Sequence, residues 1–274
     1  MLKFAANLSM MYTEVPFLER FALAANDQFK GVEFLFPYAY SAAEIARQLS
    51  YNGLEQVLFN AVPGNWDAGE RGLACLPGRQ AECLAGVEKA LEYAVVLGNR
   101  RIHFMAGIVP DSLNRAVAHE YYCQNLSRAA ALAAQAEVTL LIEPINPFDM
   151  PGYFLTTQQQ AHQLIDLLNL PNIKVQMDLY HCQIVEGDLS RKLATYLPGG
   201  RVGHVQIAGV PHRHEPDNGE LNIGYLFDLL RQLDYQHWIG CEYRPARSTR
   251  EGLAWLEQER RKNEGEKTCS NALN

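Results

Sequence analysis

The sequence predicts a single (β/α)8 barrel, an α/β fold of the TIM-barrel type. Eight short apolar runs alternate with longer segments of helical periodicity, and this alternation is typical of a parallel sheet. The eight runs and the length of 274 residues favour a closed barrel over an open sheet. An open doubly wound sheet is the alternative, but no GxGxxG motif follows the first apolar run, which favours the barrel.

The apolar runs are the predicted strands, because each is short and bounded by polar or turn-forming residues. In chain order they lie at 3–9, 31–36, 55–60, 101–107, 138–143, 173–178, 202–208 and 238–242. Helices are predicted between them, most clearly at 41–53, 80–98 and 114–136. Ser41 and Glu44 match a capping box that opens the first of these, and Gly98 is placed to end the second.

One domain is predicted over residues 1–256, with a polar tail after it. Ser248 and Glu251 match a second capping box, which predicts the start of the last helix. The segment 257–274, "EQERRKNEGEKTCSNALN", is polar and is predicted to be a frayed helix or a disordered end.

Composition predicts a soluble, cytoplasmic protein. The net charge of −7 argues against a nucleic-acid partner, and no run approaches the roughly 20 apolar residues that span a membrane. The first residues lack the pattern of a secretory signal, and the six cysteines show no CxxC pair, so we expect reduced thiols. A homo-oligomer is left open, since Tyr121 and Tyr122 suit either a core or an interface.

Polar side chains end the last four predicted strands. They are Glu143, Asp178, Gln206 and Glu242, and the carboxyl ends of barrel strands meet at one rim, where active sites lie. A single carboxylate there is usually solvated or caps a helix, but three that converge would repel unless a cation lies between them. Carboxylate and amide oxygens suit Mg²⁺ or Mn²⁺ better than zinc. The sequence therefore predicts a divalent metal site at this rim.

The other strands offer candidates for substrate binding. Asn7, Asn60 and His103 lie at the ends of strands one, three and four, and His181 follows Asp178 by three residues. Strand two offers Glu33, and His204 lies two residues before Gln206, where it is either a ligand or a core histidine. For His103 and His181 the alternative is a residue of the core or the surface that does not contact substrate.

The long loop after the third strand, "NAVPGNWDAGERGLACLPGR", has the length and glycine content of a functional lid. Arg71 in this loop could bind a substrate carboxylate with two parallel hydrogen bonds, whereas the alternative is that Arg71 and Arg79 form structural salt bridges. Trp66 could shield the site or pack the loop. Arg213, in the loop after the seventh strand, is a further cation on the same face.

Several long stretches resemble one known family. "GVEFLFPY", "AGERGLACLPGR", "IEPINPFDMPGYFLT", "DLYHCQIVEGDL", "GHVQIAG" and "WIGCEYRP" are similar to the hydroxypyruvate isomerase family, within the xylose isomerase-like barrels. The resemblance runs from about residue 3 to residue 256. It implies a (β/α)8 isomerase that interconverts hydroxypyruvate and 2-hydroxy-3-oxopropanoate (tartronate semialdehyde). The related 2-oxo-tetronate isomerases act on a four-carbon acid.

The resemblance also implies roles for individual residues. The family's metal ligands fall on Glu143, Asp178, Gln206 and Glu242, and its proton donor and acceptor fall on Glu143 and Glu242. Such an isomerisation passes through an enediolate, which a divalent cation stabilises while two carboxylates move the proton. Ketose 3-epimerases of the same fold carry histidine where this chain has Gln206, which favours the hydroxy-acid branch.

Three other functions are kept as alternatives. Apurinic (AP) endonucleases share the fold, but they need more histidine ligands and a basic groove. A sugar-acid binding protein without activity is disfavoured because both Glu143 and Glu242 are present. The choice between hydroxypyruvate and 2-oxo-tetronate depends on pocket volume, which the sequence does not give, and one carbon is worth only ~1–3 kcal/mol.

Overall fold

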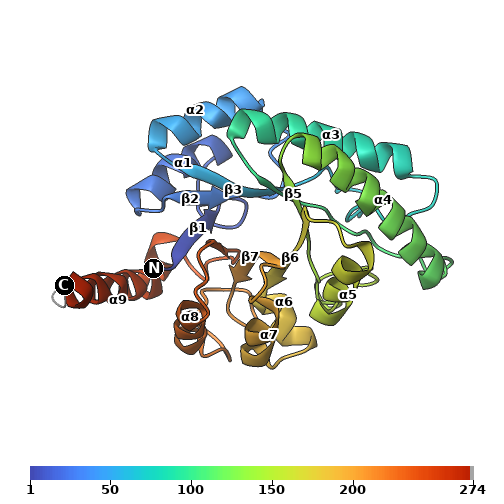
Figure 1. Cartoon of the computed structure of the whole chain (residues 1–274). Helices are drawn as coiled ribbons and strands as arrows, with labels where there is room; N and C mark the ends of the chain where they lie inside the picture. The colour runs from blue at the N-terminus through green and yellow to red at the C-terminus, as the bar shows by residue number, and fades with distance from the viewer. Residues whose placement is uncertain (272–274) are drawn as a thin grey trace.

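The computed structural model describes residues 1–271, and their side chains as far as residue 262. Its centre is a closed barrel in which each strand pairs in parallel with its neighbours in chain order, and β1 closes on β8 (Figure 1). The strands are β1 Lys3–Asn7, β2 Gly31–Glu33, β3 Glu55–Asn60, β4 Arg101–His103, β5 Thr139–Ile142, β6 Ile173–Asp178, β7 Val202–Ile207 and β8 Trp238–Cys241. The predicted fold class and all eight strand positions are confirmed.

Helices follow every strand and form the outer layer (Figure 1). They are α1 Phe17–Asn26, α2 Ala42–Asn52, α3 Gln80–Leu97, α4 Arg115–Gln135, α5 Gln158–Leu168, α6 Leu179–Val185, α7 Leu189–Tyr196, α8 Ile223–Gln232 and α9 Ala254–Asn271. The capping box of Ser41 and Glu44 and the left-handed C-cap at Gly98 are both present. The connection from β6 to β7 holds two helices, where simple alternation predicted one.

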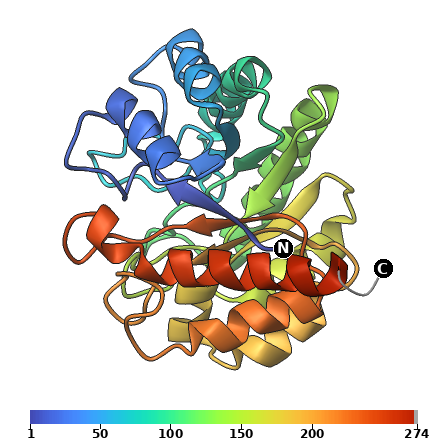
Figure 2. The ribbon, with the colours of Figure 1, turned by 90° about the vertical axis from the view of Figure 1, so that its left-hand side faces the viewer.

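The last helix begins later than predicted. Ser248 and Glu251 do hydrogen-bond, but they lead only into a short 3-10 turn, Arg250–Gly252, and α9 starts at Ala254. The start of α9 is held by Trp255, whose ring packs against Phe4 of β1 and Phe227 of α8. Figure 2 shows α9 crossing the molecule beside the beginning of β1. The predicted tail thus starts within α9, and its end, 272–274, lies outside the described residues.

The barrel interior changes from apolar to polar along the strands. Five buried apolar residues from β1, β3, β5 and β8 pack together in one cluster, namely Ala5, Val57, Leu58, Leu141 and Trp238. The Trp238 ring lies so close to β2 that a Cβ at Gly31 would meet it at 2.9 Å, so glycine there makes room for the ring. Polar side chains fill the interior farther along, and the rim they lead to carries the candidate site.

Two predicted strands were too long. The runs 31–36 and 101–107 continue past β2 and β4, because their last residues leave the sheet and form the loops around the rim. Tyr122, which suited a core or an interface, is fully buried in the core. None of the described helices has the length and apolar character needed to cross a membrane.

Candidate metal centre and active site

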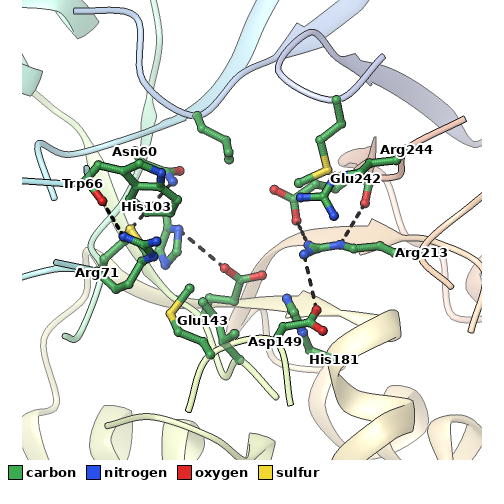
Figure 3. A pocket seen from close by; sticks show the side chains of 15 residues that line it. Asn60, Trp66, Arg71, His103, Glu143, Asp149, His181, Arg213, Glu242 and Arg244 are labelled. Carbon is green, nitrogen blue, oxygen red and sulfur yellow. Dashed lines mark hydrogen bonds and ion pairs between the residues drawn. The ribbon is translucent and has the colours of Figure 1, made fainter. Parts of the chain in front are cut away.

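Three carboxylates gather at the carboxyl ends of β5, β6 and β8, and Figure 3 shows two of them, Glu143 and Glu242. Glu143 directly follows β5, Asp178 is the last residue of β6, and Glu242 directly follows β8. One ligand atom from each of them, together with one from His181, lies within 4.8 Å of the others. All four side chains are buried. The structure therefore brings together three of the four predicted ligands and adds a histidine.

These three buried carboxylates need a nearby cation in order to ionise together. Burial raises the pKa of Glu242 to about 8 and that of Asp178 to about 6. Burial, with the nearby Glu242 and Asp178, raises the pKa of Glu143 well above its usual range. Buried carboxylates at such short range repel one another and resist ionisation unless a positive charge joins them. Because Glu143 Oε1 is buried and has no hydrogen-bond partner among the described residues, the group fits a hard divalent cation.

Arg213 supplies part of the positive charge. Its Nη2 lies 2.6 Å from Glu242 Oε2 and 3.4 Å from Asp178 Oδ2, and its guanidinium lies over the Tyr180 ring at 4.9 Å. Burial opposes its charge, but Glu242 and Asp178 raise the pKa of Arg213 above its ordinary value. One guanidinium facing three carboxylates leaves the group short of positive charge. The sequence marked Arg213 as a cation on this face, but its carboxylate partners follow only from the fold.

His181 is oriented by the loop after β5. The side-chain nitrogen of Asn146 lies 2.7 Å from His181 Nδ1, and the backbone N–H of Asn146 donates to the same atom at 3.4 Å. Since both groups are donors, Nδ1 accepts and the ring proton lies on Nε2, which is 3.6 Å from Asp178 Oδ2. Burial, with Arg213 and His103, lowers the pKa of His181 well below its usual range. A neutral ring in this tautomer presents a hydrogen-bond donor, so it does not act as a metal ligand.

His103 faces the same group from β4. Its Nδ1 lies 3.5 Å from Glu143 Oε2, and its Nε2 is buried without a hydrogen-bond partner. Burial lowers the pKa of His103 to about 3, so the ring is neutral at physiological pH. A neutral imidazole with an unpartnered nitrogen is ready to bind a polar group of a small ligand.

A cavity of about 330 Å³ opens above the carboxylates. Figure 3 shows His181, Arg213 and Glu242 on one side, Asn60, Trp66, Arg71 and His103 on the other, and Glu143 between the two groups. Met10, Met105 and Met150 supply most of the apolar wall, with Leu35 and Ile145. A cavity with acids at its base and arginines in its walls suits a small anion that also carries polar oxygens.

Arg71 and Arg79, which were both considered as partners in structural salt bridges, behave differently. Arg79 forms salt bridges with Glu70 and Glu82, at 2.6 and 2.8 Å, and so ties the loop to α3. Arg71 lies in the cavity wall, stacked on Trp66 at 3.7 Å, and donates to the backbone carbonyls of Trp66 and Glu70. Among the described residues, no carboxylate lies within 4.0 Å of Arg71. Its positive charge is therefore available to a ligand.

Asn7 and Gln206 lie just below the cavity and do not line it. Asn7 Nδ2 donates to Glu33 Oε1 at 3.0 Å and lies 3.5 Å from Glu242 Oε1. Gln206 Nε2 donates to Glu33 Oε1 at 2.8 Å, while its Oε1 accepts from Gln176 Nε2 at 2.6 Å. Gln176 was missed, although the two-residue period of β6 puts it on the same face as Asp178.

Comparison with known proteins places the chain in a family. A family model described as "xylose isomerase-like TIM barrel" matches residues 21–259. A 2-oxo-tetronate isomerase from Cupriavidus necator is 57% identical, covering 93% of this chain and 97% of that protein. A hydroxypyruvate isomerase from Escherichia coli K12 is 45% identical, covering 94% and 99%.

Solved structures agree on the fold. A Brucella melitensis protein described as AP endonuclease, family 2, superposes with a TM-score of 0.91 at 50% identity, covering 94% of this chain and 99% of the other. A 3-keto-D-glucoside 4-epimerase from E. coli superposes with a TM-score of 0.75 at 21% identity, covering 94% and 99%, which is a likeness of fold alone. With a family match over most of the chain and relatives at this identity, the chain belongs to the xylose isomerase-like TIM barrel family.

Proposed function

We propose that this protein is an isomerase that moves a carbonyl group between adjacent carbons of a short hydroxy-oxo acid, with Mg²⁺ or Mn²⁺ as cofactor. The observation that carries the proposal is the pair Glu143 and Glu242, buried in one acidic group at the base of the cavity. They come from β5 and β8, so they approach a ligand from different sides. The names of the curated relatives support the same reaction class.

The reaction requires a proton to leave carbon 3 and return to carbon 2, while a hydroxyl proton passes between the two oxygens. One glutamate of the pair, in its ionised form, removes the proton from carbon 3 and becomes protonated, and the other, already protonated, donates its own proton to carbon 2. A divalent cation held by Glu143, Asp178, Gln206 and Glu242 would stabilise negative charge on the substrate oxygens and favour ionised carboxylates. Arg213 holds Glu242 through the 2.6 Å contact and limits its movement.

Recognition of the substrate falls to the other wall. Arg71 is the proposed partner of the substrate carboxylate, because it is the cation there without a carboxylate of its own among the described residues. Asn60, His103 and the Nε2–H of His181 supply neutral groups for hydroxyl and oxo oxygens. Neutral groups there bind uncharged oxygens without adding to the charge around the carboxylates.

The four-carbon acid is the preferred substrate in this proposal, with hydroxypyruvate as the second. The 57% identical relative is named for 2-oxo-tetronate, and the 45% identical E. coli relative for hydroxypyruvate. The cavity of about 330 Å³ leaves room for an additional hydroxymethyl group. Since one carbon contributes only ~1–3 kcal/mol, we expect turnover of both acids with a preference in kcat/KM.

A coupled isomerase assay tests the proposal. Protein stripped with EDTA is given hydroxypyruvate or 2-oxo-tetronate, with and without Mg²⁺ or Mn²⁺. Metal-dependent turnover is the expected result, and the ratio of kcat/KM values names the substrate. A folded, metal-loaded protein that turns over neither acid contradicts the proposal and directs attention to ketose epimerisation or ligand binding.

The description of the Brucella structure supplies a second candidate, cleavage of DNA at abasic sites. The net charge of −7 and the narrow cavity with buried carboxylates disfavour it, because such an enzyme must bind a phosphate backbone. Incubation with a duplex that contains one abasic site distinguishes the two functions, and we expect no metal-dependent nicking. In this proposal the partners are small molecules and the enzyme works in the cytoplasm.

A further inference from the structure

Beneath the acidic group, one carboxylate crosses the inside of the barrel. Glu33 at the end of β2 reaches β7, where its Oε2 lies 2.7 Å from His204 Nε2 and its Oε1 accepts from Gln206 Nε2 at 2.8 Å. Oε1 also accepts from Asn7 Nδ2 at 3.0 Å. These four side chains are each 1% exposed. A carboxylate buried this deeply needs several donors, and β1 and β7 supply them.

Gly240 makes this crossing sterically feasible. A Cβ at position 240 would lie 2.3 Å from Glu33 Oε2 and 2.5 Å from Oε1. Gly240 pairs with Gln206 across β7 and β8, so β8 carries no side chain at the level where the carboxylate passes. The contact between Glu33 of β2 and the side chains of β7 therefore also depends on the glycine of β8.

The contact with Glu33 determines which way the Gln206 amide faces. A carboxylate only accepts hydrogen bonds, so Gln206 must turn its Nε2 towards Glu33. Its Oε1 then lies on the opposite side, where it accepts from Gln176 of β6. Gln206 pairs with Asp178 across β6 and β7, and the Gln176 side chain that donates to this oxygen is close enough to Glu143 to favour its ionised form. The oxygen is the amide atom that binds hard cations.

Asn7 is oriented in the same way. Its Oδ1 accepts from the backbone N–H of Ser9 at 3.0 Å, which leaves Nδ2 to face Glu33 and, at 3.5 Å, Glu242 Oε1. One buried carboxylate thus accepts hydrogen bonds from two amides, and each amide is adjacent to a residue of the acidic group. Glu33 itself does not line the cavity.

We propose that Glu33 is a positioning residue of the metal centre, which presents the oxygen of Gln206 to the divalent cation and steadies Glu242 through Asn7. This inference rests on the proposed function, because it takes Gln206 as a ligand. Glu33 touches neither the substrate nor the cation in this account. Its contribution is therefore to cation affinity, and it can be measured without substrate.

The test is the Mn²⁺ affinity of Glu33→Gln, measured by the electron paramagnetic resonance signal of free Mn²⁺. A glutamine at position 33 can present an oxygen or an NH₂ group, so it no longer forces the Gln206 amide into one orientation. We expect a Kd for Mn²⁺ weakened by about 10–100-fold, the range found when groups that orient ligands are removed. Equal affinity in Glu33→Gln and wild-type protein would overturn the inference.

Two control variants separate this effect from general destabilisation. Glu55→Gln makes the same chemical change on β3, near the amino ends of the strands, where Glu55 accepts from Trp238 Nε1 at 3.0 Å. Leu230→Ala removes apolar packing from the main core near the end of α8, where Leu230 is fully buried. We expect both to keep the wild-type Mn²⁺ affinity, and Leu230→Ala to lower the Tm. If Leu230→Ala weakened Mn²⁺ binding as much as Glu33→Gln, the role of Glu33 would be structural only.

A double variant in which residues 33 and 206 exchange their side chains gives a second test of Mn²⁺ affinity. In the double variant Glu33→Gln with Gln206→Glu, residue 33 donates and residue 206 accepts, and a carboxylate at 206 offers an oxygen in either orientation. We expect Mn²⁺ affinity at least as high as in wild-type protein. This variant also serves if the single substitution does not fold, and weak binding by the folded double variant would overturn the inference.

The proposed function fails separately from the inference. Wild-type protein that binds no Mn²⁺, or an Asp178→Asn variant that binds it as tightly as wild type, would overturn the metal centre and the inference together. Tight binding by wild type with unchanged binding by Glu33→Gln would overturn the inference alone.

Discussion

The two halves of the barrel rim are built from different chemistry. Strands β5, β6 and β8 end in buried acids, and the long β7–α8 loop adds one arginine bound to them. Strands β3 and β4 end in Asn60 and His103, and the cation of that half, Arg71, comes from a loop. Glu33, the strand-end acid of the β1–β4 half, turns away from the cavity and bonds to β7.

This difference separates two tasks. Proton transfer and cation binding need charges whose positions are fixed, and strand ends held by the barrel provide them. Recognition of a small anion needs groups that can approach after it enters, and a long loop provides that. If the two halves can be impaired independently, substitutions in the acidic half should lower kcat and substitutions in the half with Arg71 should raise KM.

The largest effect is expected from the two glutamates. Glu143→Gln or Glu242→Gln keeps the shape of the side chain but removes its ability to exchange a proton. We expect kcat to fall by about 10³–10⁴-fold or more, with normal folding by circular dichroism, because general acid–base catalysis alone contributes about 10²–10⁴-fold. A variant that kept near-normal turnover would remove that residue from the mechanism.

Arg71→Ala should change KM, whereas the glutamate substitutions change kcat. Loss of a charged partner for the substrate carboxylate is expected to raise KM by about 10–100-fold while kcat changes little. Steady-state kinetics with both acids measure this, and Arg71→Lys should recover only part of the loss because a lysine cannot form two parallel hydrogen bonds.

Arg213→Ala is the matched comparison for Arg71→Ala. Arg213 contacts Glu242 and Asp178. Its loss should therefore change KM and also lower kcat by about 10–100-fold, whereas Arg71→Ala leaves kcat almost unchanged. If Arg71→Ala and Arg213→Ala gave the same kinetic pattern, the division of labour between the two halves would be wrong.

A pH effect on stability should appear only without metal. Folded Glu242 and Asp178, with pKa values raised by burial to about 8 and about 6, hold protons that an unfolded chain releases at lower pH. Stability of metal-free protein is therefore full below the unfolded pKa values and is lost as pH rises through 6 and then 8. We expect the Tm to fall by several degrees between about pH 5 and pH 8.5.

Added Mn²⁺ should abolish most of that decline, because a bound cation lets the carboxylates ionise without penalty. Thermal melts with EDTA or with Mn²⁺ across the pH range measure both curves. Glu242→Gln should flatten the upper part of the metal-free curve. Parallel curves with and without metal would contradict the assignment of these carboxylates to a cation site.

The acidic residues of the rim could be predicted from the sequence because they stand at the ends of predicted strands. Glu143, Asp178 and Glu242 stand where apolar strands end, and the order of strands in a barrel brings such ends together. The closed barrel itself followed from eight alternating units. The same logic put Asn60 and His103 at the rim, and both line the cavity.

Other features could not be predicted because they depend on contacts across the barrel or on loop conformation. The partners of Arg213 depend on a loop whose backbone has a φ of +55° at that residue. The path of Glu33 depends on the missing side chain of Gly240, more than 200 positions away in the sequence. Neither feature leaves a periodic pattern. Which of Arg71 and Arg79 forms a structural salt bridge could not be predicted for the same reason, since it depends on the position of Glu70.

The smallest effect is expected at Trp66, which tests how firmly the recognition half must be held. The Arg71 guanidinium lies 3.7 Å from the Trp66 ring centre, and Phe36 packs on the same ring at 4.8 Å. Trp66→Leu removes a cation–π contact worth about 1 kcal/mol, so we expect KM to rise roughly fivefold with kcat unchanged. Trp66→Phe keeps an aromatic face and should stay close to wild type. Arg71 keeps its hydrogen bonds to the two backbone carbonyls in both variants, so a loss as large as that of Arg71→Ala would mean that the ring, and not the loop backbone, positions the guanidinium.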